Sequence, residues 1–145
     1  MITILLPAYN EEEVIEKSLN TLQDNIKIKK NYEILVINDG STDKTLEILN
    51  QLSRKIKNLR VITHEKNKGL GAAISTGIQN AKGEIIIELD ADMTHPLEVI
   101  PDMIHKIEQG YDMCIGSRYI KNGGMKNVPL WRVVLSKVVN KINKW

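Results

Sequence analysis

Short runs of apolar and β-branched residues alternate along this chain with stretches whose apolar residues recur at helical spacing. Strands that alternate with helices form βαβ units, which build a mostly parallel sheet. The runs are nearly continuous in apolar residues, which is typical of strands covered on both faces. The pattern predicts an α/β fold with strands at 2–6, 32–37, 60–63, 84–89 and 111–115. It predicts helices at 11–22, 69–81, 96–107 and 129–144, and one more helix that begins after a cap at Ser41 or Thr42.

Length and composition limit the classes to which the protein can belong. The chain has 145 residues, 42% hydrophobic and 26% charged, which suits one globular domain and excludes a disordered tail or a fibre. Cys114 is the single cysteine, so an internal disulfide and a cysteine zinc cluster are excluded. No apolar run approaches the roughly 20 residues that span a bilayer. We expect the protein in the cytoplasm, peripheral on the cytosolic face of a membrane.

Charge is unevenly distributed along the chain. The net charge is +2, yet residues 117–145 hold seven Lys and Arg residues and no acid, which leaves −5 for residues 1–116. This division predicts an α/β core at 1–116, followed by a basic loop and an amphipathic helix at 117–145. A basic end suits phosphates or an anionic membrane surface. A solvated lysine-rich terminus is the alternative.

Polar residues gather where the predicted strands end, and the carboxyl ends of strands are where open α/β sheets bind ligands. Asp90 and Asp92 are the sharpest signal, since they follow an isoleucine-rich strand and are one residue apart. Two such carboxylates repel each other without a cation. Mg²⁺ or Mn²⁺ takes oxygen ligands together with substrate phosphates. The pair therefore indicates a divalent metal site, and the alternative is a solvated turn that caps the next helix.

Two glycines, Gly69 and Gly71, resemble part of a dinucleotide-binding fingerprint. Ile74 stands where that fingerprint needs glycine or alanine, and the segment follows the third strand rather than the first. We predict instead that these glycines let the start of a helix pack closely, with a phosphate nearby. The histidines, His64 among them, show no spacing typical of metal ligands.

The series of motifs resembles the family 2 glycosyltransferases, and most closely their dolichol-phosphate (polyprenol-phosphate) mannosyltransferases. The similarity covers about residues 2–140 and lies in five segments, namely 7–11 (PAYNE), 38–41 (NDGS), 67–73 (NKGLGAA), 90–96 (DADMTHP) and 116–119 (GSRY). The resemblance implies a GT-A fold with a Rossmann-like sheet. It also implies transfer of a sugar from a nucleotide donor with inversion, and it favours GDP-mannose as the donor and a polyprenyl or dolichyl phosphate as the acceptor.

The resemblance also implies roles for individual residues. Those matching the donor site are Pro7, Tyr9 and Glu11 for the nucleoside, Ile37 and Asp39 for the base, Asp90, Ala91 and Asp92 for the ribose, diphosphate and metal, and Arg118 for a phosphate. Arg118, Arg132 and Ser136 match the acceptor-phosphate site. Asp92 and Arg118 are the expected catalytic residues, and Mg²⁺ or Mn²⁺ is the expected cofactor. Thr94 stands where close relatives carry a glutamine as a second metal ligand.

An ionised lipid phosphate needs positioning more than deprotonation, and Arg132 can hold it through two parallel hydrogen bonds. The helix expected at 129–144 carries Trp131 and Trp145, which suit a membrane surface. Packing of this helix against another part of the domain is the alternative. The resemblance implies further strands beyond these residues, so we expect a fold incomplete at its C-terminus, or a partner that supplies the missing part.

Several alternatives to this function stay open. The donor can be a UDP-sugar, such as a glucose or GlcNAc donor, and the acceptor a glycan. A non-catalytic nucleotide-binding fragment or subunit is a reading from another class. Nucleotidyl transfer is disfavoured, because the segment at 7–11 lacks the glycine-rich basic loop that this chemistry uses. No nucleic-acid partner is expected.

Overall fold

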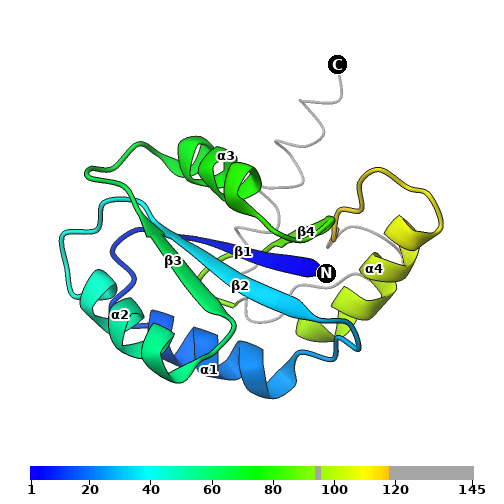
Figure 1. Ribbon diagram of the computed structural model, residues 1–145, viewed down its shortest axis with the longest axis horizontal. Helices are drawn as coiled ribbons and strands as arrows, with labels where there is room; N and C mark the ends of the chain where they lie inside the picture. Colours follow the sequence, from blue (N-terminus) through cyan, green and yellow to red (C-terminus); the bar gives the residue numbers. More distant parts are fainter. Residues whose placement is uncertain (94–95, 118–145) are drawn as a thin grey trace, which may run out of the picture. The chain divides into compact units, whose positions relative to one another are not determined.

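Four parallel strands form one sheet in the order β3-β2-β1-β4 in the computed structural model, which describes residues 1–93 and 96–117. The elements run β1 (Ile2–Ala8), α1 (Ile15–Asn25), β2 (Tyr32–Asn38), α2 (Thr45–Lys55), β3 (Leu59–Thr63), α3 (Leu70–Asn80), β4 (Ile85–Glu88), a 3₁₀ turn η1 (Leu97–Val99) and α4 (Ile100–Glu108), as Figure 1 shows. Residues Met1–Met113 make up one compact unit. None of the helices in these described residues is long and apolar enough to cross a bilayer.

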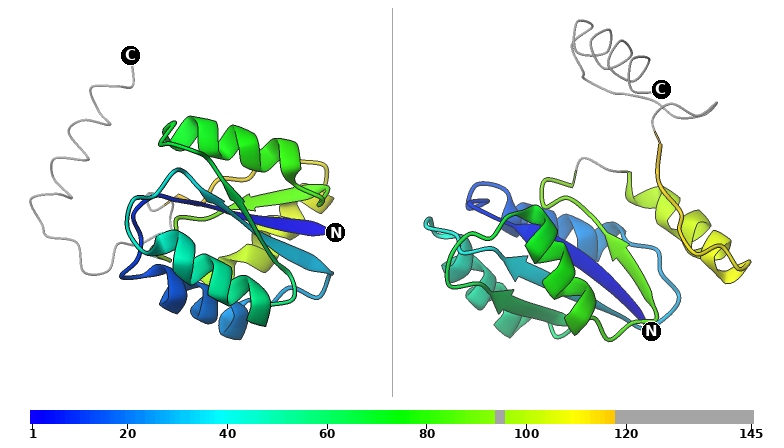
Figure 2. Two further views of the ribbon diagram at one scale, coloured as in Figure 1. Left: turned by 60° about the vertical axis from the view of Figure 1, so that its left-hand side comes forward. Right: turned by 90° about the horizontal axis from the view of Figure 1, so that it is seen from above.

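Helices cover the sheet on both faces, as the continuous apolar strands predicted. In Figures 1 and 2, α3 lies on one face, and α1 and α2 lie on the other. Successive side chains of β1 point to opposite faces. Ile4 and Leu6 enter the core that α1, α2 and α4 share, while Leu5 enters a smaller cluster with Ala73 of α3. All three β1 side chains are fully buried, so residues 4–6 form an unbroken apolar run.

The glycines of α3 act differently from the sequence prediction. A Cβ added at Gly69 or Gly71 would meet nothing within 4 Å, so neither provides the predicted close packing. Gly69 instead adopts a φ of +88°, a left-handed conformation that favours glycine, directly before the helix. The close approach is at Gly77, where an added Cβ would lie 2.2 Å from the side chain of Leu5.

One predicted strand is absent and three helix starts differ, among them the helix predicted from residue 96, whose α-helical part starts at Ile100 after a 3₁₀ turn. Residues 111–115 form no strand and pair with none of the four strands of the described sheet, which leaves Tyr111 and Met113 58% and 73% exposed. The helix predicted from residue 11 starts at Ile15. The helix expected after a cap at Ser41 or Thr42 starts at Thr45. The backbone N–H of Thr45 donates to Asp43 Oδ1 rather than to Ser41 or Thr42. The helix predicted at 129–144 lies outside the described residues.

The strand order fixes where a ligand can enter. The chain moves from β1 outward to β2 and β3, and then crosses back to place β4 on the other side of β1. The connections therefore diverge at the carboxyl ends of β1 and β4 and leave a crevice there. Open α/β sheets bind ligands at such a switch point.

Candidate functional site

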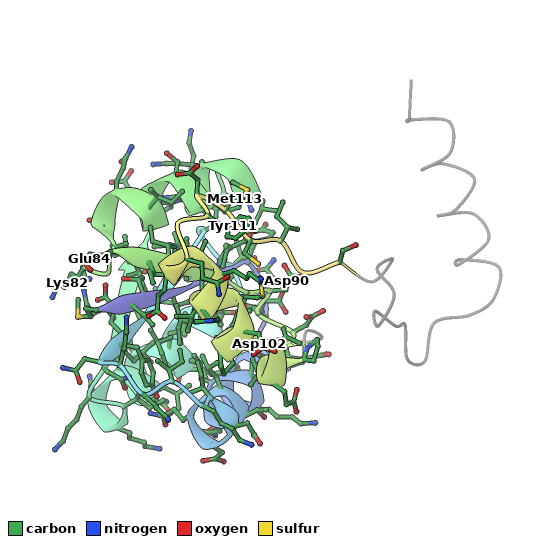
Figure 3. The ribbon with its side chains drawn as sticks, turned by 90° about the vertical axis from the view of Figure 1, so that its right-hand side faces the viewer. Lys82, Glu84, Asp90, Asp102, Tyr111 and Met113 are labelled. Carbon is green, nitrogen blue, oxygen red and sulfur yellow. The ribbon has the colours of Figure 1, made fainter. Side chains whose placement is uncertain are left out.

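A cavity of about 420 Å³ lies at this switch point. It is lined by Pro7, Ala8, Tyr9 and Glu11 after β1, by Asp39 after β2, by Asn67, Leu70 and Ala73 around the start of α3, and by Asp90, Ala91 and Asp92 after β4. Figure 3 shows Asp90 at one end of β4, with Lys82 and Glu84 at the other. Segments far apart in the sequence thus meet at one edge of the sheet.

The loops that follow β1 and β2 are fastened to each other by hydrogen bonds. The backbone N–H groups of Glu11 and Glu12 donate to Thr45 Oγ1 over 2.8 Å and to Asp43 Oδ2 over 3.1 Å. In return, the Lys44 N–H donates to Glu12 Oε2 over 2.9 Å. These bonds tie residues 11 and 12 to the loop after β2, and α1 begins only at Ile15.

Asn10 completes this link from a left-handed conformation, with a φ of 55°. Its backbone N–H donates to Ser41 Oγ over 3.0 Å, and its side-chain Oδ1 accepts the Thr42 N–H over 2.9 Å. Asparagine tolerates this backbone conformation better than most residues. The two cavity-lining residues on either side of it, Tyr9 and Glu11, are therefore set by a loop with defined geometry.

Asp39 is buried at the floor of this edge and accepts three hydrogen bonds. Its Oδ1 accepts from Lys68 N–H over 3.0 Å and pairs with His64 Nδ1 over 2.6 Å, while its Oδ2 accepts from Gly69 N–H over 2.8 Å. Burial raises the pKa of Asp39, but the hydrogen bonds from His64, Lys68 and Gly69 outweigh it, and the pKa lies below its ordinary value. The side chain is therefore a carboxylate at neutral pH.

Negative charge accumulates around Glu11, which lines the cavity. Burial raises the pKa of Glu11, and the nearby carboxylates of Asp92 and Asp43 raise it further. A carboxyl group whose pKa is raised by its neighbours lies in a field that attracts cations. This part of the cavity therefore favours binding of a cation or of a positively charged group of a ligand.

The donor set suits a hard divalent cation only with help from a ligand. No group of three or more His, Cys, Asp or Glu side chains in the described part of the chain is arranged to hold a metal ion. Asp90 and Asp92 offer carboxylate oxygens at the cavity, and Mg²⁺ commonly binds through one or two carboxylates plus substrate phosphates and water. The residues present fit such a shared site, and Thr94 lies outside the described residues.

The structure brings most of the predicted donor-site residues together. Seven of them line the one cavity: Pro7, Tyr9, Glu11, Asp39, Asp90, Ala91 and Asp92. Ile37 does not, because it is fully buried in the cluster between the sheet and α3. Arg118, Arg132 and Ser136 lie outside the described residues.

Sequence reasoning missed other residues of this site. Asn67, Leu70 and Ala73 line the cavity because the loop before α3 folds over Asp39. The motif at 67–73 was a signal for them. His64 was considered only as a metal ligand, whereas it pairs with Asp39. Its position, directly after β3 and level with the end of β2, was the available signal.

The family model described as glycosyl transferase family 2 matches residues 3–141 of this chain. Dolichol-phosphate mannosyltransferase of Pyrococcus furiosus is 41% identical over 136 residues, which cover 94% of this chain and 38% of that relative. This chain therefore spans well under half the length of that relative.

Solved structures share the fold. The mannosyltransferase PcManGT from Pyrobaculum calidifontis, in complex with GDP-Man and Mn²⁺, matches with a TM-score of 0.58 and 27% identity, over 63% of this chain and 27% of that one. S. aureus TarS 1–349 in complex with UDP-GlcNAc matches with a TM-score of 0.63 and 31% identity, over 74% of this chain and 31% of that one. These matches confirm the GT-A fold implied by the motif series.

Proposed function

This chain belongs to glycosyl transferase family 2, and we propose that it forms the donor-binding part of an enzyme that transfers a sugar from a nucleotide sugar to a polyprenyl phosphate. The observation that carries the proposal is the cavity at the switch point of the sheet, where Asp39 and the segment Asp90–Asp92 face one space. Residues 1–116, together with Arg118, are assigned to the donor side, and residues 117–145 to the acceptor.

The nucleoside lies on the wall built by β1 and β2 in this proposal. Pro7 and Tyr9 offer apolar surface, and Asp39 offers a carboxylate that can accept from ring N–H groups. GDP-mannose is the favoured donor, because the relative from P. furiosus is a mannosyltransferase and the structural neighbour PcManGT holds GDP-Man. A UDP-sugar is the second candidate, since TarS, with the same fold, holds UDP-GlcNAc.

The diphosphate lies near Asp90 and Asp92, where the acidic wall needs positive charge. Asp92 is the proposed ligand of a Mg²⁺ or Mn²⁺ ion, which supplies Lewis-acid stabilisation of the departing diphosphate when bound; the neighbour PcManGT holds Mn²⁺. Arg118 adds a second positive charge to the diphosphate. Transfer with inversion requires one displacement, in which an acceptor oxygen bonds to the anomeric carbon as the bond to the diphosphate breaks.

The acceptor is proposed to bind through the basic residues of 117–145. Arg118, Arg132 and Ser136 are assigned to its phosphate, and the excess of Lys and Arg in this segment suits an anionic membrane surface. The relative's name, dolichol-phosphate mannosyltransferase, supports a polyprenyl phosphate as acceptor. A peripheral position on the cytosolic face of a membrane follows from this proposal.

Calorimetric titration of the chain with GDP-mannose and with UDP-GlcNAc, each with Mn²⁺ or with excess chelator, tests the donor assignment. The proposal expects binding of GDP-mannose that depends on the metal and is stronger than binding of UDP-GlcNAc. Stronger binding of UDP-GlcNAc would move the assignment to the second candidate. Absence of binding by either donor would contradict the proposed function.

A further inference from the structure

A buried chain of hydrogen bonds joins Asp39 to helix α3 through His64. The distance from His64 Nδ1 to Asp39 Oδ1 is 2.6 Å, and that from His64 Nε2 to Thr76 Oγ1 is 2.9 Å. Asp39 and His64 are only 3% and 7% exposed. Both nitrogens of the ring therefore have a partner, and the imidazole is fixed between the end of β2 and the middle of α3.

The protonation of this chain follows from its acceptors. Asp39 is a carboxylate and can only accept, so Nδ1 of His64 carries a hydrogen and donates it. Nε2 then accepts from the Thr76 hydroxyl when the ring is neutral. A carboxylate has about four acceptor positions, and three on Asp39 are filled by His64, Lys68 and Gly69. One position on Oδ2 is left for a ligand at the cavity.

We propose that His64 is a positioning residue for the nucleotide, acting through Asp39 and anchored by Thr76. The inference rests on the proposed function, because it assumes that Asp39 meets the nucleotide. His64 and Thr76 do not line the cavity, so they act on a ligand through Asp39 and the loop before α3. Without the imidazole, the carboxylate loses its only side-chain donor among the described residues and is held by the N–H groups of Lys68 and Gly69 alone.

The packing around His64 couples its position to the residues that line the cavity. The His64 backbone N–H donates to the Asn38 carbonyl over 2.9 Å, which holds the residue level with the end of β2. An added Cβ at Gly40 would lie 2.3 Å from the carbonyl carbon of Lys66, so the loop after His64 packs tightly on the turn after Asp39. The loop also carries Asn67, which lines the cavity. A change at His64 is therefore transmitted to the nucleotide wall at two points.

The test compares four single variants, and Thr76→Val in an Asp39→Ala background, by calorimetric titration with GDP and UDP in the presence of Mn²⁺. His64→Leu removes both hydrogen bonds, His64→Asn keeps an N–H near the position of Nδ1, and Thr76→Val removes only the anchor. His105→Asn, on the exposed surface of α4, is the matched control. Each titration is run well below the unfolding temperature of that variant, so that stability does not enter the affinity.

We expect His64→Leu to weaken binding of the preferred nucleotide about tenfold and Thr76→Val about threefold, as loss of a buried hydrogen bond predicts. His64→Asn should stay within about threefold of the wild type by the same reasoning. His105→Asn should bind as the wild type does. In an Asp39→Ala background, Thr76→Val should have a smaller effect than in the wild type, because the part of its influence that passes through Asp39 is already lost.

Unchanged affinity in both His64→Leu and Thr76→Val would overturn the inference and leave the proposed function intact. If His64→Leu does not fold, Thr76→Val alone tests the inference. Full nucleotide affinity of Thr76→Val in the wild-type background would overturn the inference. An equal loss of affinity with and without Asp39 would overturn it as well. A wild-type chain that binds neither GDP nor UDP would contradict the proposed function itself, and this inference with it.

Discussion

The backbone N–H of Glu11 donates to the hydroxyl of Thr45 over 2.8 Å, so the loop after β1 is fastened to the first turn of α2. Thr45 is fully buried, and Glu11 lines the cavity. The position of a cavity wall therefore depends on a side chain that lies in another βα unit.

Thr45→Val keeps the shape of this side chain and removes the acceptor. We expect the free energy of unfolding to fall by about 1–3 kcal/mol, because a partly buried N–H loses its partner. Donor affinity should fall as well, since Glu11 is no longer held. Urea unfolding and donor titration measure the two effects. Thr63→Val, exposed on β3, is the control, and equal behaviour of the two variants would refute the link.

A second polar cluster lies at the amino end of the sheet, far from the cavity. Glu33 accepts from Arg60 Nη1 over 2.6 Å, from the Lys82 N–H over 2.7 Å and from Thr3 Oγ1 over 2.8 Å. Burial raises the pKa of Glu33, but the hydrogen bonds and the charge of Arg60 outweigh it, and the pKa lies below 4.5.

This shift predicts acid sensitivity. A carboxyl group with a lowered folded-state pKa stabilises the fold above its unfolded-state pKa, and the contribution is lost as the pH falls from about 4.5 through the folded-state value. Glu33→Gln should be less stable than the wild type at pH 7 and should lose less stability on acidification. Urea unfolding between pH 3 and pH 7 measures this, with the exposed Glu84→Gln as control. Parallel pH profiles for wild type and Glu33→Gln would contradict the assignment.

Substitution by alanine should have opposite effects on thermal stability at Gly83 and at Gly71. An added Cβ at Gly83 would lie 2.4 Å from the backbone nitrogen of Thr3, whereas one at Gly71 would meet nothing within 4 Å. Gly83→Ala should therefore destabilise the protein, because the return into β4 must move away from β1. Gly71→Ala should stabilise it by up to about 1 kcal/mol, since alanine is the better helix former. Thermal unfolding compares the two variants. If Gly71→Ala were destabilised as well, the close contact between Gly83 and Thr3 would not explain the difference between the two sites.

The acceptor assignment makes a prediction about residues 117–145. Attraction of about 1 kcal/mol for each basic residue near an anionic surface should bring the chain to anionic liposomes at low salt, and screening should release it at high salt. Arg132→Ala should leave donor affinity unchanged. In a version of the protein extended to the length of its relatives, the same change should lower transfer of the sugar to a lipid phosphate. Liposome flotation and a transfer assay measure these effects. Equal loss of donor and acceptor use would refute the assignment.

Local patterns in the sequence predicted what depends on local physics. Strands β1 to β4 were expected within one or two residues of where they lie, because buried apolar runs need no distant partner to be recognised. The segment 111–115 is also mostly apolar, yet Tyr111 and Met113 are exposed and no strand forms. A strand depends on its neighbour in the sheet, and a sequence pattern does not contain that neighbour.

The candidate site shows the same division. Residues at the ends of β1 and β4 were predicted together, because a parallel sheet brings its carboxyl ends to one edge. The link between His64 and Asp39 was missed, since it depends on the register of β3 against β2. Ile37 was expected to meet the base, but its side chain alternates onto the face under α3. Identity of a residue type in a motif does not fix the face to which its side chain points.

Titration calorimetry of GDP-mannose in the presence of Mn²⁺, with the wild type and Asp92→Asn side by side, tests the central claim most directly. Asp92→Asn keeps the size of the side chain and removes its charge, and Asp102→Asn on α4, visible in Figure 3, is the control for loss of a surface carboxylate. We predict that Asp92→Asn abolishes the Mn²⁺-dependent part of the binding, while Asp102→Asn binds as the wild type does. Undiminished, metal-dependent binding by a folded Asp92→Asn would contradict the account.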